Sequence, residues 1–126
     1  EEKNITKIIS QIKDITDSII VCDDHSTDNT NKIVRSLGVE LITHPTNLGY
    51  GSAIKSIFAK AKEINSDVLV TMDADGQHRI DDLKKILKPV LSDSVDISIG
   101  SRFLGGTSAS KFRKTGIKII ANISMF

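Results

Sequence analysis

The sequence predicts an α/β fold, with three layers (α/β/α) built around a mostly parallel sheet. Two observations lead to this prediction. Apolar residues recur at helical spacing in several segments, and short apolar runs lie between those segments. The runs are continuously apolar rather than alternating with polar residues, which is typical of parallel strands covered on both faces.

Four segments predict amphipathic helices, because their apolar residues recur at i, i+3, i+4 and i+7. We expect Ser26 or Thr27 to cap the second helix, and Gly38 to follow it in a left-handed conformation. The apolar stripes are Ile5, Ile8, Ile9 and Ile12; Ile33, Val34 and Leu37; Ala53, Ile54, Ile57, Phe58 and Ala61; and Leu83, Ile86, Leu87, Val90 and Leu91.

The apolar runs between these helices predict four strands, and one loop connects the second strand to the third helix. A flexible "GGTSAS" stretch is followed by what we expect to be the start of a fifth helix, over 111–126. We therefore expect a core domain over 1–110 and a separate helical segment after it. The predicted strands cover 18–24, 39–43, 67–72 and 96–102, and the loop covers 44–51.

The composition limits the classes of function. The chain has 126 residues, which suits one domain, and its net charge of +1 argues against a broad nucleic-acid surface. The single cysteine, Cys22, excludes an intrachain disulfide and fits a core thiol in a reducing compartment such as the cytoplasm. No apolar run approaches the roughly 20 residues that span a bilayer, and no signal peptide is evident.

Charged side chains follow three of the four predicted strands. Asp23 and Asp24 end the first, Asp73 and Asp75 follow the third, and Arg102 ends the fourth. In sheets of this kind, ligands bind at the carboxyl ends of the strands. We therefore expect these four carboxylates and the guanidinium to lie along one edge.

The D-x-D pair is a candidate site for a divalent cation. Asp73 and Asp75 can approach one ion if the chain turns after the second carboxylate, and Gly76 permits such a turn. Oxygen ligands suit Mg²⁺ or Mn²⁺, and Gln77 can add an amide oxygen while His78 can contact the ion or a phosphate. The alternative is a loop whose aspartates only cap the next helix.

The first carboxylate pair has two interpretations. Asp23 or Asp24 could accept hydrogen bonds from a nucleotide base or ribose, or both could hold the turn before the second helix. For Asp28 we favour the helix terminus, and we expect His25 at the loop surface.

The segment "HPTNLGYG" also has two interpretations. Its Asn47, Gly49 and Gly51 either let a backbone approach a nucleotide or form a tight turn. Arg102 either meets a phosphate or is a surface charge.

Taken together and in order, these segments resemble the family 2 glycosyltransferases, which bind nucleotide sugars on a GT-A fold. The resemblance rests on "VCDDHSTDNT", "HPTNLGYGSAIKSIF", "VLVTMDADGQH" and "ISIGSRF", and it covers about residues 1–115. The "DADGQH" and "GSRF" stretches look most similar to the polyprenyl-phosphate (dolichol-phosphate type) sugar synthases. The resemblance implies an inverting transfer of a sugar from a UDP- or GDP-sugar, with a divalent cation on the diphosphate.

The resemblance also implies roles for the nucleotide-binding residues. Asp24 matches the aspartate that recognises the base, and Asp23 lies beside it. Asn47, Gly49 and Gly51 match the loop that borders the nucleotide.

The other implied roles concern the cation and the phosphates. Asp73 matches the first D-x-D carboxylate, near ribose and diphosphate, and Asp75 matches the direct metal ligand. Gln77 matches a further ligand in the polyprenyl-phosphate subgroup. Arg102 and Arg113 match basic residues that meet donor or acceptor phosphates, so Asp73, Asp75 and Arg102 are the candidate catalytic residues.

The chain departs from the family pattern at both ends. Glu1 and Glu2 match the end of a segment that follows the family's central first strand, and the family's acceptor-binding half does not follow Phe126. We therefore expect a fragment that is inactive in transfer and binds nucleotide weakly or not at all. A sheet edge left without its neighbour would also favour self-association. No downstream catalytic carboxylate motif is present, which suits an acceptor that is already an anionic phosphate.

Residues 111–126 alternate basic and apolar side chains. Such a helix can lie on an anionic membrane surface, which would place the full-length protein at the cytoplasmic face of a membrane. Equally, it could pack on the remainder of a longer chain.

Two rival functions remain open. One is a haloacid-dehalogenase-like phosphohydrolase, in which Asp73 would be the nucleophile, although that family's D-x-D lies on its first strand. The other is a non-catalytic nucleotide-binding domain. A dinucleotide-binding site is disfavoured, because no G-x-G-x-x-G follows a strand.

Overall fold

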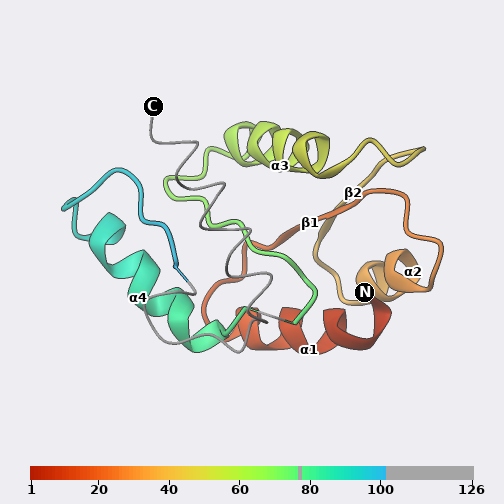
Figure 1. The fold of residues 1–126 in the computed structure, drawn as a ribbon, viewed down its shortest axis with the longest axis horizontal. Coiled ribbons are helices and arrows are strands. Elements are labelled where there is room, and N and C mark those ends of the chain that lie inside the picture. Colours follow the sequence, from red (N-terminus) through yellow and green to blue (C-terminus); the bar gives the residue numbers. More distant parts are fainter. Residues whose placement is uncertain (77, 102–126) are drawn as a thin grey trace, which may run out of the picture.

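The computed structural model describes residues 1–76 and 78–101, and it confirms an α/β fold. In this part of the chain, helices and strands follow one another as Figure 1 shows. The elements are α1 (Glu2–Lys13), β1 (Ile20–Asp23), α2 (Thr30–Ser36), β2 (Glu40–Thr43), α3 (Tyr50–Glu63) and α4 (Ile80–Leu91).

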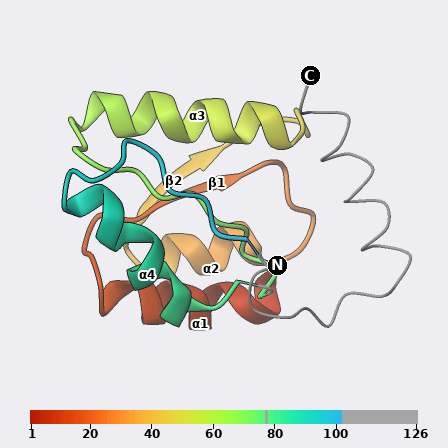
Figure 2. The same ribbon diagram turned by 60° about the vertical axis from the view of Figure 1, so that its left-hand side comes forward.

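The elements form three layers. The two strands lie in the middle, α3 covers one side, and α1 and α2 cover the other (Figures 1 and 2). Helix α4 lies beside α1 at one end of the molecule. The four helices predicted before residue 101 are present, and the sheet is covered on both faces as expected.

The hydrophobic core lies between the sheet and the layer of α1 and α2. Ile5 and Ile9 of α1 meet Val34 of α2 and Ile19 beside β1, and all four side chains are buried. Val21 of β1 packs against this cluster from the sheet. The apolar stripe of α1 therefore forms one side of the core, and this explains why its isoleucines recur at helical spacing.

The register of the sheet fixes which residues can meet. Strands β1 and β2 are parallel, and Asp23 pairs with Thr43. The backbone N–H of His44 donates to the carbonyl oxygen of Asp23 at 3.0 Å, so the pairing continues one residue past β2. Successive side chains of a strand point to opposite faces. Asp23 therefore faces α2, whereas Asp24 and His44 face α3.

Two predicted strands are wrong within the described residues. The segments over 67–72 and 96–100 have no ladder pairing there, and the described sheet consists of β1 and β2 alone. Their apolar residues match a strand, but a strand also needs a neighbour for its N–H and C=O groups. Ile97 and Ile99 are also 77% and 85% exposed.

The predicted boundaries need two smaller corrections. Helix α2 begins at Thr30 with Asn29 at its N-cap, so neither Ser26 nor Thr27 caps it. Asp28 lies at the helix terminus as expected, because its Oδ1 accepts a hydrogen bond from the Thr30 N–H at 3.0 Å. Helix α3 begins at Tyr50, so the predicted loop ends at Gly49. Gly38 follows α2 with a φ of 66°, as predicted.

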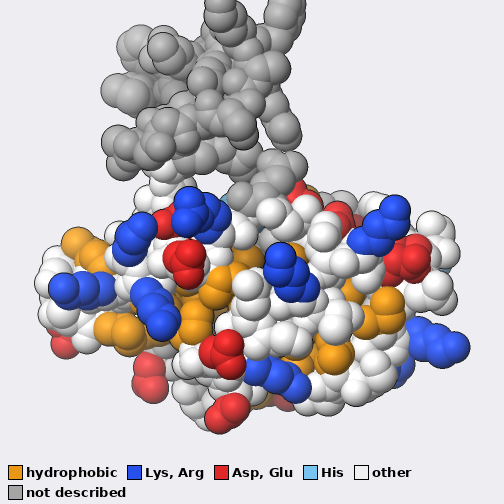
Figure 3. All heavy atoms as spheres, turned by 90° about the horizontal axis from the view of Figure 1, so that it is seen from below, with side chains coloured by type: hydrophobic (Ala, Val, Ile, Leu, Met, Phe, Trp, Pro, Cys, Tyr) orange, Lys and Arg blue, Asp and Glu red, His pale blue; other side chains and the backbone are white. Residues whose placement is uncertain are grey.

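Basic and acidic side chains are interspersed on the face shown in Figure 3, and hydrophobic side chains lie between them. This pattern agrees with the nearly balanced charge of the sequence. Among the described helices, none is long and apolar enough to cross a membrane. The segment over 111–126 lies outside the described residues.

Candidate functional site

The neighbouring carboxylates Asp23 and Asp24 have different surroundings. Asp23 is buried and faces α2, where its Oδ1 accepts from the Ser26 N–H at 3.0 Å and its Oδ2 from Asn31 Nδ2 at 2.8 Å. Burial alone would raise the pKa of the Asp23 carboxyl, but the hydrogen bonds from Ser26 and Asn31 outweigh burial and lower it. Asp23 thus fixes the turn between β1 and α2, and contact with a nucleotide stays a prediction for it.

Asp24 faces the opposite side and organises the loop that leads into α3. Its Oδ1 accepts from the Leu48 N–H at 2.9 Å and lies 2.6 Å from His44 Nδ1, and its Oδ2 accepts from the Gly49 N–H at 2.7 Å. The backbone donor of Leu48, followed by His44, lowers the pKa of the Asp24 carboxyl. Asp24 is therefore ionised at neutral pH.

His44 is a site residue that the sequence reasoning missed. Its side chain is 8% exposed, and its Nε2 lies 2.9 Å from Ser56 Oγ of α3 and 3.8 Å from Cys22 Sγ of β1. Cys22 is only partly buried, so it borders this polar cluster rather than lying in the apolar core. One signal could have identified His44: it follows the β2 strand directly, at the same sheet edge as Asp24.

The predicted nucleotide loop is brought together with Asp24. Asn47 Oδ1 accepts from the Gly49 N–H at 3.1 Å, so the amide and the Asp24 carboxylate share one donor. Gly49 has φ 85° and ψ 163°, a conformation that L-residues rarely adopt. Gly51 lies in the first turn of α3 and not in the loop.

The two glycines should respond oppositely to alanine. Gly49→Ala should destabilise the chain by about 1–3 kcal/mol, because the side chain penalises the positive φ. Gly51→Ala should stabilise it by about 0.5–1 kcal/mol, because alanine is the better helix former and nothing lies within 4 Å of the added carbon. Urea denaturation of both variants measures the difference. Equal free energies of unfolding would contradict the assigned loop conformation.

The D-x-D segment is followed by a turn at Gly76. Asp73 is exposed, and its Oδ2 lies 3.7 Å from His78 Nε2. The carbonyl oxygen of Asp75 accepts from Asn4 Nδ2 of α1 at 3.2 Å, and Gly76 follows with a φ of 79°. Asp73 and Asp75 therefore precede a turn, as the sequence predicts, but the segment before them is not a strand. The bond from Asn4 also holds this turn against α1, which the sequence did not predict.

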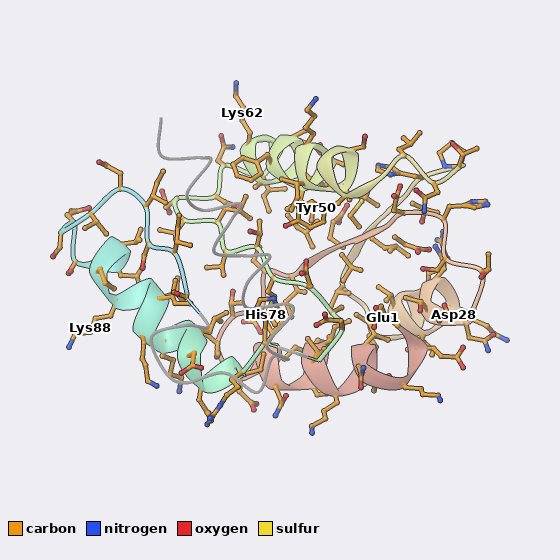
Figure 4. All side chains as sticks on the ribbon, viewed as in Figure 1. Glu1, Asp28, Tyr50, Lys62, His78 and Lys88 are labelled. Carbon is orange, nitrogen blue, oxygen red and sulfur yellow. The ribbon has the colours of Figure 1, made fainter. Side chains whose placement is uncertain are left out.

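A polar cavity of about 270 Å³ opens between this turn and α1. Its lining includes Lys7 and Asn4 from α1, and Gly76, His78 and Arg79 from the chain before α4 (Figure 4 labels His78). Lys7 and Arg79 carry positive charge, and Asp81 adds one carboxylate to the lining, 3.6 Å from Arg79. The cavity therefore places two basic side chains and one acidic side chain next to the D-x-D turn.

Several predicted site residues lie outside the described part of the chain, namely Gln77, Arg102 and Arg113. Among the residues that are described, no group of three His, Cys, Asp or Glu side chains gathers to hold a metal. The oxygen ligands that the sequence places at this turn are the carboxylates of Asp73 and Asp75. This set suits Mg²⁺, which usually takes one or two protein carboxylates and completes its shell with phosphate and water.

Known proteins with similar sequences identify the family of the chain. The family model described as Glycosyl transferase family 2 matches residues 1–123. The UDP-N-acetylglucosamine–dolichyl-phosphate N-acetylglucosaminyltransferase of Methanococcus voltae is 37% identical over 120 residues, which cover 81% of this chain and 48% of that protein.

Two further relatives are named for related activities. The dolichol-phosphate mannosyltransferase of Pyrococcus furiosus is 33% identical to this chain. The match covers 84% of this chain and 31% of the length of that protein. The dolichyl-phosphate hexose transferase of Haloferax volcanii is 30% identical to this chain. The match covers 100% of this chain and 54% of the length of that protein. The chain thus spans about half the length, or less, of these curated relatives. No solved structure matches it significantly.

Proposed function

The chain belongs to glycosyl transferase family 2, and from this premise we propose that the full-length protein transfers a sugar from a nucleoside diphosphate sugar to a polyprenyl phosphate. The donor is a UDP- or GDP-sugar, and the transfer inverts the anomeric carbon. The observation that carries the proposal is the geometry around Asp24. This ionised carboxylate lies at the carboxyl end of β1 and holds the Asn47–Gly49 loop, where a base can approach.

The D-x-D turn supports the diphosphate part of the proposal. Asp73 and Asp75 would hold Mg²⁺ or Mn²⁺ with Gln77, and such a cation stabilises the charge that develops on the leaving nucleoside diphosphate. Lys7 and Arg79 in the adjacent cavity supply further positive charge. These side chains would bind and orient the phosphates.

The acceptor is proposed from the relatives' names, which include dolichyl or dolichol phosphate. A phosphate acceptor is already anionic at neutral pH, so the protein needs no general base to deprotonate the acceptor. Arg102 and Arg113 would position it. The basic and apolar residues over 111–126 would bring this part of the chain to the cytoplasmic face of the membrane that holds the lipid.

An assay with radiolabelled sugar tests this proposal. The full-length protein is incubated with UDP- and GDP-sugars, Mn²⁺ and a polyprenyl phosphate, and lipid-soluble label is measured. We expect the label to reach the lipid only with the acceptor present, and a chelator to abolish transfer until Mn²⁺ is restored. Release of free sugar without a lipid product would contradict the proposed acceptor, and transfer that persists in chelator would contradict the cation.

A further inference from the structure

The hydrogen-bond capacity of Asp24 is nearly filled by the protein itself. Each oxygen of a carboxylate has two lone pairs and can accept two hydrogen bonds. Among the residues that the structure describes, Oδ1 accepts from both His44 Nδ1 and the Leu48 N–H, and Oδ2 accepts only from the Gly49 N–H. One acceptor position therefore remains for a ligand, and it lies on Oδ2.

The contacts of His44 hold its Nδ1 against Oδ1 of Asp24. Because the ionised Asp24 can only accept, the proton must be on Nδ1 of His44. Its Nε2 then either accepts from the Ser56 hydroxyl or, in the protonated ring, donates to it at the same 2.9 Å. Asp24 Oδ1 receives the Nδ1–H in either state. The ring is fixed from β1 by Cys22 and from α3 by Ser56.

The order Ser56–His44–Asp24 matches the connectivity of a hydrolytic triad, but its setting does not suit acyl transfer. Ser56 lies within α3, whose backbone N–H groups donate to carbonyls one turn earlier. Those N–H groups are not available to stabilise an oxyanion. The contacts from Ser56 to His44 and from His44 to Asp24 therefore orient the Asp24 carboxylate, and His44 is a positioning residue.

We infer that His44 makes Asp24 select a base with one imide N–H, uracil or thymine, over guanine. This inference rests on the proposed function, because it takes the Asp24 edge as the place where the base binds. Uracil and thymine present a single N–H between two carbonyl groups. Guanine presents two adjacent donors, N1–H and the 2-amino group, and their bidentate partner is a carboxylate with both oxygens open. With Oδ1 filled, the second guanine donor is left unpaired, which costs affinity.

Calorimetry on the full-length protein tests the selection. UDP, dTDP and GDP are titrated separately with Mn²⁺ present. We expect UDP or dTDP to bind at least roughly tenfold more tightly than GDP, which corresponds to one lost hydrogen bond. Comparing UDP with dTDP shows which of the two bases, with its ribose or deoxyribose, is the natural one. GDP binding as tightly as both would overturn the inference and leave the proposed function standing, whereas no binding of any of the three would contradict both.

Variants of His44 separate selection from a general loss of structure. His44→Ala opens Oδ1, so the ratio of the GDP dissociation constant to that of UDP or dTDP should fall by about fivefold or more. His44→Asn can place an amide N–H near the former Nδ1, so it should restore most of the ratio. A variant that merely disturbs the fold would weaken all three nucleotides equally. An unchanged ratio in folded His44→Ala, checked by circular dichroism, would therefore overturn the role of His44. Should that variant not fold, the ratio in His44→Asn decides: a ratio near that of the unsubstituted protein supports the role, and a ratio near unity overturns it.

Discussion

Replacing Asp75 by alanine in the full-length protein should remove the metal dependence of nucleotide binding. If Asp75 is the direct ligand of the cation, its loss leaves Asp73 to hold the ion without its main partner. Losing one such electrostatic contact costs about 2.7–4 kcal/mol of barrier, so sugar transfer should fall roughly 10²- to 10³-fold. Calorimetry with and without Mn²⁺ measures the binding, and labelled-sugar transfer measures the rate.

Asp67→Ala is the matched control for this experiment. Asp67 has the same charge and is exposed, and it lies at the start of the segment that leads to the D-x-D turn, outside the lining of the cavity. We expect its removal to leave the metal dependence intact. Should Asp75→Ala retain the Mn²⁺-dependent affinity of the unsubstituted protein, the assignment of Asp75 as a ligand is wrong.

Replacing Ile9 by alanine should cause the largest loss of stability among single core changes. Ile9 is 1% exposed and belongs to the buried cluster formed by α1, α2 and the sheet. Truncating a buried isoleucine to alanine costs about 2–5 kcal/mol, because transfer energy is lost and a cavity remains. That is a large share of the roughly 5–15 kcal/mol that stabilises a typical domain. Urea denaturation followed by circular dichroism measures the change.

The same substitution at an exposed position provides the control. Ile97 is 77% exposed, so Ile97→Ala should change the free energy of unfolding by no more than about 0.5 kcal/mol. Equal losses at the two positions would mean that Ile97 is buried in solution. In that case the segment over 96–100 would have a partner beyond the described contacts.

The helices could be predicted from the sequence, because their signal is local. Ile5 and Ile9 recur at helical spacing and are buried, as expected. The segments over 67–72 and 96–100 carry an equally clear apolar signal, yet they have no ladder among the described residues. A strand depends on its neighbour, and the identity of that neighbour is not written in the strand's own residues.

In the candidate site, too, some residues could be predicted from local sequence and others depend on distant neighbours. Asp24 and the loop of Asn47 and Gly49 follow from motifs that resemble a known family, and the structure brings these residues together. His44 could not be predicted from the motifs. Its contact with Asp24 depends on the register of β1 and β2, which sets residues far apart in the chain side by side.

The division of Asp23 and Asp24 between two faces has a genetic consequence. The codon for Asp23 specifies a side chain that holds the fold, so damage there is conditional: cooler growth or a stabilising change elsewhere can suppress it. The codon for Asp24 specifies a side chain that holds the loop before α3 and also meets the ligand in our proposal, and added stability replaces only the first of these roles. Suppressors that stabilise the fold should therefore restore mutants at Asp23 more fully than mutants at Asp24.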